Sequence, residues 1–364
     1  MALGKLQLGT YQAHAIVLDN ASRNVPTIPA RLENSISVQL IESPENLGTA
    51  ARNLGVRAAP QEAEWIIMLD DDSAPIETPE TPFYAFVQRL CGLPRDVAAV
   101  SAEIVLPGQG CRESGGLPEV FIGCGVAIRR NAFLDAGGYD PSFGYYVEEY
   151  DLAARFLLAG LRVAHDPGFV VEHHKVAAGR DMNQILARLV RNNGFVLERY
   201  APESVRQTML EEMLTRYKRI AAKEHALEGY AKGRGQLEES IESQLRSPMP
   251  SPIWDRFTGL AHAREALQAA WKVSPFCRYA LVDEGKNAWA VRQALVELSD
   301  RVEREGNPPL EGCADHRDAQ VCVVSTLSPG PMRDALARWS LGNQRVVVPW
   351  LAVQAPLAQR EIVG

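Results

Sequence analysis

The sequence has no pair of cysteines at the spacing of a metal-binding or redox motif. Its six cysteines, at positions 91, 111, 124, 277, 313 and 322, are scattered along 364 residues without C-x-x-C spacing. This pattern argues against structural zinc and against a disulfide framework, and it fits a reducing cytoplasm. No apolar run approaches the roughly 20 residues of a membrane span. The first ten residues also lack the long apolar core of a signal peptide, so we expect a cytoplasmic protein.

The sequence has fewer basic than acidic residues. With 38 Lys and Arg against 45 Asp and Glu, the formal net charge is -7, which argues against a general nucleic-acid binder. A protein of this charge needs a metal ion or local arginines if it handles anionic phosphates. The sequence has no internal repeat and no low-complexity tract. Its length and its 46% hydrophobic residues indicate a globular chain long enough for two domains.

An apolar run that ends in three acids is the most informative stretch. Residues 65–72 read W-I-I-M-L-D-D-D, and the apolar part predicts a buried strand. Because ionised carboxylates are rarely buried without partners, we place the acids at the carboxyl end of a sheet, where open α/β sheets bind ligands. Asp70 and Asp72 share a face of an extended chain, which suits a hard divalent cation that keeps positions open for phosphate oxygens. The alternative is a solvated acidic turn.

The first half of the chain alternates strand and helix patterns. This alternation is typical of an α/β fold with a mainly parallel sheet flanked by helices. Thr49 is expected to cap the first helix, and Pro167-Gly168 to form a turn between two short strands. The predicted strands are 13–18, 36–41, 65–69, 97–106, 126–129, 162–164 and 169–172, and the predicted helices are 49–59, 81–90, 131–136 and 150–159.

A series of motifs follows in order between residues 13 and 202. They are V-L-D-N-A-S at 17–22, N-L-G-T-A-A-R-N-L-G at 46–55, L-D-D-D at 69–72, F-I-G-C-G-V-A-I-R-R at 121–130, G-G-Y-D-P-S-F-G at 137–144, Y-V-E-E-Y-D-L-A-A-R at 146–155 and V-V-E-H-H at 170–174. One such motif is weak evidence. In this order and spacing, the series resembles the family 2 glycosyltransferases, which have the GT-A fold.

The resemblance implies a nucleotide-sugar donor, which is a UDP-, GDP- or dTDP-sugar. Asp19 resembles the acid that contacts the nucleobase, and Asn20 stands beside it. Arg52 lies in the helix that lines the nucleotide pocket. Gly123 and Gly125 would line the donor sugar and the acceptor side, since small residues allow the backbone to approach a ligand closely.

The resemblance also implies a divalent cation, Mg²⁺ or Mn²⁺, held by a DXD pair. Asp70 would face the ribose, and Asp72 would hold the cation on the diphosphate. Asp71 fills the variable middle position and is given no role. His173 matches the histidine that follows the last strand and helps to hold the metal or the diphosphate, a place that His174 is able to take instead. The alternative for both histidines is a solvated strand end.

Two further acids match the catalytic position of the family. Glu148 and Glu149 align with its Glu-Asp pair, whose second acid is the expected general base, here the longer Glu149. One base and a metal-bound leaving group imply a single displacement with inversion at the anomeric carbon. The alternative is that both acids interact with the dipole of the helix that follows. Asp151 and Arg155, four residues apart, are expected to form a structural ion pair.

The amino-terminal part departs from the resembled pattern. Members of the family open with a strand and a loop that supply part of the nucleobase pocket, followed by a helix. Here only residues 3–11 precede the first predicted strand, enough for the tail of that helix at most. Either the sequence starts too late or the strand is missing, and a missing strand leaves a central sheet position empty. A later strand is not expected to fill it, because the later strands have partners of their own.

The second half is predicted to contain a helical segment and a small Rossmann-like α/β domain. Gly229, Gly233 and Gly235 are expected to interrupt a charged helical pair over 203–245, and 247–252 reads as a linker. Only Gly285 remains of a glycine-rich turn, so a packing or regulatory role is favoured over dinucleotide binding. The predicted domains are 1–202, 203–272 and 273–364, with helices at 182–200, 261–270, 288–298 and 332–339 and strands at 278–282, 319–325 and 345–348.

Together these patterns predict an enzyme, a metal-dependent inverting glycosyltransferase that acts on the hydroxyl of a glycan or a lipid-linked acceptor. A bacterial surface polysaccharide or a related glycan is the expected product. The rivals are a catalytically decayed glycosyltransferase-like scaffold, a sugar-nucleotide-binding protein and a nucleotidyltransferase. The last is disfavoured because no glycine-rich basic loop lies near the amino terminus. A peripheral contact with the inner face of the membrane and a homo-oligomer are left open, as are the sugar and the linkage.

Overall fold

The computed structural model describes residues 2–79, 81–108, 110–113, 115–175, 181–342 and 344–349. The described residues form two compact units, the first within Met1–Ile67, Ile128–Leu161 and Lys175–Trp254, and the second within Met68–Ala127, Arg162–His174 and Asp255–Gly364. The part of the predicted small domain beyond residue 349 lies outside the described residues. None of the helices in the described ranges has the length and apolar character needed to cross a bilayer.

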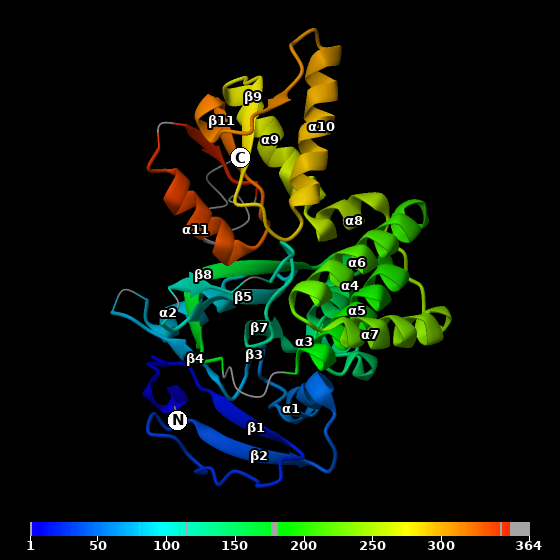
Figure 1. The fold of residues 1–364 in the computed structure, drawn as a ribbon. Coiled ribbons are helices and arrows are strands. Elements are labelled where there is room, and N and C mark those ends of the chain that lie inside the picture. The colour runs from blue at the N-terminus through cyan, green and yellow to red at the C-terminus, as the bar shows by residue number, and fades with distance from the viewer. Residues whose placement is uncertain are drawn as a thin grey trace. The chain divides into compact units, whose positions relative to one another are not determined.

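The fold is α/β, and its strands pair mainly in parallel (Figure 1), as the alternating pattern predicts. A two-stranded parallel sheet has the order β1-β2, and a six-stranded sheet has the order β3-β7-β5-β8-β4 with β6 beside β5. Within the larger sheet β5 and β8 are parallel, whereas β4 and β6 run antiparallel to their neighbours. The strands are β1 (His14–Asn20), β2 (Ser37–Ser43), β3 (Trp65–Leu69), β4 (Ser73–Ile76), β5 (Val97–Leu106), β6 (Cys111–Arg112), β7 (Gly125–Arg129) and β8 (Arg162–His173).

The strands that follow β1 and β2 in the sequence pair with one another, as predicted. Each strand from β3 to β8 pairs within the six-stranded sheet, and none of the described strands joins β1 or β2 to that sheet. The two amino-terminal strands pair with each other, in a parallel register that sets His14 opposite Ser37 and Asn20 opposite Ser43.

The last strand of the large sheet differs from its prediction. The sequence predicts two short strands separated by a turn at Pro167-Gly168, but β8 is continuous and the turn is a bulge. The pairing with β5 passes from Ala102 opposite Asp166 to Glu103 opposite Val170, so the inserted residues bend the strand without ending it. The prediction was wrong because Pro and Gly signal a turn locally, while tertiary pairing on both sides of them keeps the strand intact.

The first helix also begins differently from its prediction. The sequence predicts Thr49 as the cap, but Gly48–Ala51 is a 3-10 turn that leads into α1, and the Thr49 side chain caps no helix. The Thr49 backbone N–H and hydroxyl both donate to the Gly144 carbonyl, at 2.8 and 3.0 Å. The helices of this half are α1 (Arg52–Ala58), α2 (Phe83–Cys91), α3 (Arg130–Asp135) and α4 (Glu148–Leu158), with 3-10 turns at Ala2–Lys5 and Pro141–Phe143.

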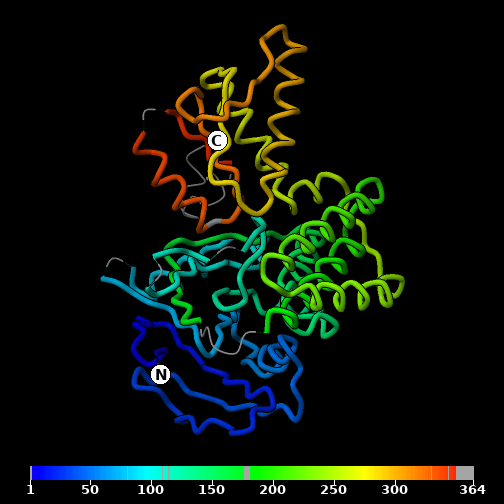
Figure 2. Tube along the Cα trace, in the orientation of Figure 1, coloured from blue at the N-terminus to red at the C-terminus, as the bar shows by residue number. Residues whose placement is uncertain are grey.

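Three long helices of the first unit pack side by side (Figure 2). They are α5 (Met182–Tyr200), which has the predicted bounds, α6 (Glu203–Lys223) and α7 (Leu227–Ser240), followed by a 3-10 turn at Ile241–Ser243. Gly229, Gly233 and Gly235 do not interrupt the helical pair as predicted, because all three lie inside α7. A Cβ at Gly229 or Gly233 would come within 2.2 or 2.3 Å of the α5 backbone, so these two glycines allow the two helices to approach closely.

The described part of the predicted small α/β domain, which lies in the second unit, contains a four-stranded parallel sheet with helices on both faces. The sheet has the order β10-β9-β11-β12. Alternate residues of β11 face opposite sides, so that Val321 and Val323 pack on α9 and α10 while Cys322 and Val324 pack on α11. Figure 1 shows α10 and α11 on opposite sides of this sheet. The elements are α8 (Ser251–Thr258), which begins inside the predicted linker, α9 (Leu260–Val273), β9 (Arg278–Val282), α10 (Ala288–Arg304), β10 (Glu311–Gly312), a 3-10 turn (His316–Asp318), β11 (Val321–Val324), α11 (Pro329–Trp339) and β12 (Arg345–Val347).

The glycines of α7 give a prediction with its own control. We expect Gly233→Ala to lower the free energy of unfolding by about 1–3 kcal/mol, because the new methyl group overlaps the α5 backbone. Gly235→Ala is the control, since a Cβ there meets no atom within 4 Å. It should raise the free energy of unfolding by about 0.5–1 kcal/mol, because alanine loses less backbone entropy in a helix than glycine. Urea denaturation followed by circular dichroism measures both, and equal shifts of the same sign would contradict the close helix contact.

Candidate functional site

The acids that follow β3 are held in a tight turn by Ser73. The Asp70 backbone N–H donates to the Ser73 hydroxyl at 2.7 Å, and the Ser73 N–H donates back to the Asp70 carbonyl at 3.1 Å. The same hydroxyl donates to the Cys124 carbonyl at 2.9 Å, which ties the turn to the loop before β7. Ser73 begins β4, an edge strand that the sequence does not predict and whose edge position tolerates Pro75.

The register between β4 and β8 brings His173 to these acids. Ser73 lies directly opposite His173 in the antiparallel pair, and the His174 N–H donates to the Asp72 carbonyl at 2.8 Å. His173 Nε2 then lies 3.3 Å from Asp72 Oδ1. Residues that are about a hundred positions apart in the chain therefore meet at the end of the sheet, as the predicted metal site requires.

The other ring nitrogen of His173 faces a carboxylate that the sequence does not single out. His173 Nδ1 lies 2.7 Å from Glu113 Oε2 and 3.5 Å from Cys124 Sγ. We assign the Nδ1 proton to the Glu113 hydrogen bond, which leaves the Nε2 lone pair directed at the Asp72 carboxylate. Two electron-rich groups then face each other, and a bound cation would attract both. Glu113 was missed because it lies in a short segment without a strand or helix signal.

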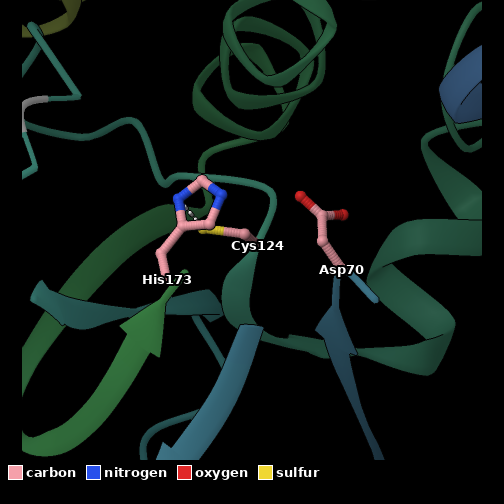
Figure 3. Close-up of side chains that lie close together, drawn as sticks. All are labelled: Asp70, Cys124 and His173. Carbon is pink, nitrogen blue, oxygen red and sulfur yellow. Dashed lines mark hydrogen bonds between the residues drawn. The ribbon is translucent and has the colours of Figure 1, made fainter. Parts of the chain in front are cut away.

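The donor atoms at the sheet end fit a divalent cation. Asp70, Cys124 and His173 each offer a ligand atom within 4.8 Å of the others, and Figure 3 shows the His173 ring beside the Cys124 sulfur with the Asp70 carboxylate facing it. Carboxylates and an imidazole form a ligand set for a first-row divalent metal. The contact of Nδ1 with Glu113 is the arrangement that orients metal-binding imidazoles in proteins. The residues present therefore suit the predicted metal ion.

Other residues near this point are placed away from the cluster. Asp71 is exposed, in keeping with the absence of a predicted role. His174 is exposed and pairs with Glu172 at 3.2 Å. Gly123 is buried in the loop before β7, while a Cβ on Gly125 would lie 2.4 Å from the Ile104 side chain. Packing against β5 therefore accounts for Gly125, and a contact of either glycine with a donor sugar stays a prediction.

The predicted catalytic acids begin α4, in the first unit. Glu148 and Glu149 are its first two residues, and Glu148 is 3% exposed whereas Glu149 is half-buried. The two residues before them, Tyr146 and Val147, have φ of +71° and +73°. A β-branched residue in the left-handed region is strained, and such strain persists only where the surroundings enforce it. Strained backbone clusters at functional sites, so this turn is a second candidate for a functional role.

Asn192 of α5 enforces the strained turn. Its buried amide donates to the carbonyls of Phe143, Tyr145 and Tyr146 at 3.0, 3.0 and 2.7 Å. Arg191 donates to the Phe143 carbonyl at 2.8 Å from the same helix. Nothing in the sequence marks Asn192, because its role depends on carbonyls more than 40 residues away.

Burial separates the two acids electrostatically. Desolvation, and after it the negative charge of Glu149, raise the pKa of the Glu148 carboxyl well above its ordinary value of 4.5. The positive charge of Arg52 and a hydrogen bond with Thr49 act in the opposite direction. No described residue gives Glu148 Oε2 a hydrogen bond. The two neighbouring acids therefore differ in burial, and the pKa of the more buried Glu148 is raised.

The predicted donor-binding residues lie at the end of β1 and the start of α1. Asp19 is 5% exposed and accepts a hydrogen bond from the Ser22 N–H at 3.2 Å. Asn20 holds the turn before α1, because its Oδ1 accepts from the Leu47 N–H at 2.9 Å and its amide donates to the Gly48 carbonyl at 3.1 Å. Arg52, the first residue of α1, interacts electrostatically with Glu148. The first unit thus brings Asn20, Arg52 and Glu148 into one connected region through the turn at 46–49.

The ion pair predicted on α4 is confirmed. Arg155 Nη2 lies 2.6 Å from Asp151 Oδ2, four residues earlier on the helix. Asp151 is fully buried and also accepts from Arg199 at 2.9 Å and from the Tyr200 hydroxyl at 2.7 Å. Several partners satisfy the buried carboxylate, so Asp151 anchors α4 on α5.

The raised pKa of Glu148 predicts how stability depends on pH. A carboxyl whose pKa is raised by folding contributes stability below its unfolded pKa and loses it as the pH rises through the folded value. We therefore expect the free energy of unfolding to fall above about pH 4.5, and Glu148→Gln, which keeps the neutral form, to flatten that fall. Urea denaturation at pH 4, 6 and 8 tests this. Glu228→Gln, an exposed acid in the first turn of α7, is the control and should follow the wild type. A Glu148→Gln curve parallel to that of the wild type would mean that Glu148 is ionised in the folded protein.

No family model matches the sequence, and no curated protein matches it. A crystal structure of GalNAc-T7 with UDP, GalNAc and Mn²⁺ is similar at 15% identity and a TM-score of 0.44, over 66% of this chain but only 53% of that one. The mannosyltransferase PcManGT from Pyrobaculum calidifontis, in complex with GDP-Man and Mn²⁺, is similar at 17% identity and a TM-score of 0.38, over 79% and 78% of the two chains. A crystal structure of S. aureus TarS residues 1–349 in complex with UDP is similar at 11% identity and a TM-score of 0.42, over 84% of this chain and 86% of that one. These values are too low to transfer a function, which has to be argued from the residues of this chain.

Proposed function

We propose that this chain is a metal-dependent glycosyltransferase that moves a sugar from a nucleotide-diphosphate sugar to an acceptor hydroxyl. The observation that carries the proposal is the cluster at the ends of β3 and β8 and the start of β4, where Asp72 Oδ1 and His173 Nε2 lie 3.3 Å apart and Glu113 holds Nδ1. Asp70 and Asp72 would hold the cation with His173. A cation bound there stabilises the negative charge that develops on a leaving diphosphate. Asp70 and Asp72 are the two acids of the DXD pattern in the sequence L-D-D-D.

The donor set favours Mn²⁺ over Mg²⁺. Mg²⁺ takes oxygen ligands almost exclusively, whereas imidazole suits first-row transition metals. The hydrogen bond from His173 to Glu113 makes Nε2 a better ligand, because it places the proton on the other nitrogen and increases the basicity of the ring. The exposed Asp71 and His174 would take no part.

For the acceptor step we propose Glu149 as the general base. It is half-buried and less desolvated than Glu148, so it is the acid of the pair that is suited to be ionised and to accept a proton. Glu148 would stay protonated and help to shape the turn that presents Glu149. A single base with no second carboxylate nucleophile corresponds to direct displacement, and we propose inversion at the anomeric carbon.

For the donor we propose contacts with Asp19 and Arg52, which lie at the end of β1 and at the start of α1. Asn20 has both its amide groups engaged by the turn at 46–48, so its proposed role is to shape this region. UDP-, GDP- and dTDP-sugars all remain candidate donors, and a glycan or a lipid-linked acceptor remains the proposed second substrate.

A sugar-nucleotide-binding protein without transferase activity is the second candidate. The observation that favours it is the separation of β1 and β2 into a sheet of their own, since none of the described strands pairs them with the larger sheet. Such a protein would bind a nucleotide-sugar and Mn²⁺ but show no turnover. The two experiments below separate the candidates.

The first experiment compares the neighbouring acids Asp72 and Asp71. We expect Asp72→Asn to lower the Mn²⁺-dependent hydrolysis of nucleotide-sugars by at least about 100-fold, because one carboxylate ligand of the cation is lost. Asp71→Asn, the matched control, removes the same charge at an exposed position and should stay within about twofold of the wild type. A panel of UDP-, GDP- and dTDP-sugars with and without Mn²⁺ gives the measurement. Background hydrolysis in all three proteins would favour the binding protein, and equal activity of Asp72→Asn and the wild type would reject the metal site.

The second experiment separates binding from chemistry at Glu149. Glu149→Gln should abolish transfer and leave donor affinity nearly unchanged, because the amide keeps the size of the side chain but accepts no proton. Transfer is measured with a labelled nucleotide-sugar, and donor affinity by calorimetry in the presence of Mn²⁺. Normal turnover in this variant would move the base to another group. The folded state is checked by comparing its thermal unfolding with that of the wild type.

A further inference from the structure

The small α/β domain contacts the segment that carries Glu113. Residues 111–113 and 115–118 of this segment lie in the same compact unit as the domain. Arg112, directly before Glu113, forms ion pairs with Asp334 of α11 and with Glu103 of β5. A Cβ on Gly330 of α11 would come within 2.6 Å of the Arg112 side chain and 3.2 Å of the Glu113 carbonyl. The start of α11 is therefore fitted closely against the backbone at Glu113.

Two helix-cap residues of the small domain converge on Gly116, three positions after Glu113. Ser328 is the N-cap of α11 and Asn287 is the N-cap of α10, yet neither side chain caps its own helix. The Gly116 N–H instead donates to Ser328 Oγ at 2.8 Å, and the Gly116 carbonyl accepts from Asn287 Nδ2 at 2.5 Å. An N-cap side chain normally accepts from an N–H of its own first turn. Both residues are thus used to fix one glycine of another segment.

The place where Gly116 is bound is the position at which an α/β sheet usually takes a ligand. Asn287 follows the carboxyl end of β9, and Ser328 follows that of β11. These two strands are the central pair of the order β10-β9-β11-β12, where the chain passes from one side of β9 to the other. Gly116, whose φ is +94°, occupies this point with both of its backbone polar groups. Because Gly116 takes the place of a ligand here, the domain has no need of a glycine-rich turn that would bind one.

A buried ion-pair network runs beside this contact. Glu103 is 3% exposed and accepts from His165 at 2.9 Å, and it pairs with Arg112 and, at 3.5 Å, with Arg333 of α11. Glu103, Glu113 and Gly330 line one small cavity. Since a buried carboxylate is costly unless it is paired, these contacts fix α11 against the strands that carry the proposed cation site.

We infer that the small α/β domain is part of the cation site, in which Ser328 and Asn287 are positioning residues. They hold Gly116, three positions after Glu113, whose Oε2 lies 2.7 Å from His173 Nδ1. Glu113 in turn fixes the ring whose Nε2 faces Asp72. The inference rests on the proposed function, in which His173 is a metal ligand. Loss of an outer partner of a ligating histidine weakens metal binding about 10- to 100-fold.

The test measures Mn²⁺ binding to the full chain directly, by electron paramagnetic resonance of the free ion. Glu113→Gln should weaken the binding about 10- to 100-fold. Ser328→Ala and Asn287→Ala should each weaken it about three- to tenfold, the factor that corresponds to one hydrogen bond. Ser299→Ala is the matched control, because Ser299 Oγ also accepts from a backbone N–H, that of Leu310 at 2.8 Å, within the same domain but away from Gly116. It should bind Mn²⁺ like the wild type.

A metal-free measurement separates positioning from a loss of folding. Nitrogen NMR of labelled histidine reports the environment of His173, whose signal is assigned by its loss in His173→Gln. The signal should shift in Ser328→Ala and in Asn287→Ala, but not in Ser299→Ala, while circular dichroism shows the wild-type fold. Asn287 is half-buried, so its variant serves if the fully buried Ser328 does not tolerate alanine.

The outcomes distinguish this inference from the proposed function. If Ser328→Ala and Asn287→Ala bind Mn²⁺ as tightly as the wild type while Glu113→Gln binds it more weakly, the domain takes no part in the site and the inference is wrong. If Glu113→Gln also binds like the wild type, the link through His173 is wrong. If the wild type binds no Mn²⁺ at all, the proposed function fails, and the inference fails with it.

Discussion

The pairing of His173 between Asp72 and Glu113 is the interaction on which the proposed chemistry depends. It exists because β4 runs antiparallel to β8 with Ser73 opposite His173, so the acidic turn and the histidine reach the same end of the sheet. A shift of this register by one residue would turn the His173 side chain to the other face of the sheet. The bulge in β8 lies in its pairing with β5, before residues 170–173, which pair with β4. The backbone of the sheet therefore sets the geometry of the candidate metal site.

Glu148 and Glu149 of the first unit follow a strained turn, which hydrogen bonds from Asn192 of α5 hold in place. Tyr146 and Val147 adopt positive φ, and Asn192 satisfies the carbonyls that this conformation turns toward α5. The turn places Glu148 in the interior and Glu149 in a half-buried position, and burial raises the pKa of the Glu148 carboxyl. The residue types alone do not supply this difference in burial. Each unit thus contributes a group of residues that its own contacts hold in place.

The sequence predictions were right where the structure follows local periodicity, and wrong where a contact between distant residues decides it. Elements with a clear period, such as the apolar strand β5 and the amphipathic helix α5, have the predicted bounds. The errors concern glycine, proline and threonine, which were read as local breaks or caps. Gly229 and Gly233 lie inside α7 because α5 packs against them, Pro167-Gly168 forms a bulge because β5 pairs on both sides of it, and Thr49 binds Gly144 instead of capping α1. In each case a partner distant in sequence outweighs the local preference.

The sequence by itself determined the α/β class, the strand that ends in acids and the motifs that nominate Asp70, Asp72, His173 and the Glu148-Glu149 pair, because periodicity and residue type are local properties. Only the tertiary structure decided that Glu113 orients His173, that Asn192 holds the turn before α4, and that Ser328 and Asn287 bind Gly116. These contacts join residues 46 to 212 positions apart, and three of the four involve a backbone group that any residue type presents. No pattern along the chain encodes such pairs, since they arise from the packing of elements that the sequence specifies one at a time.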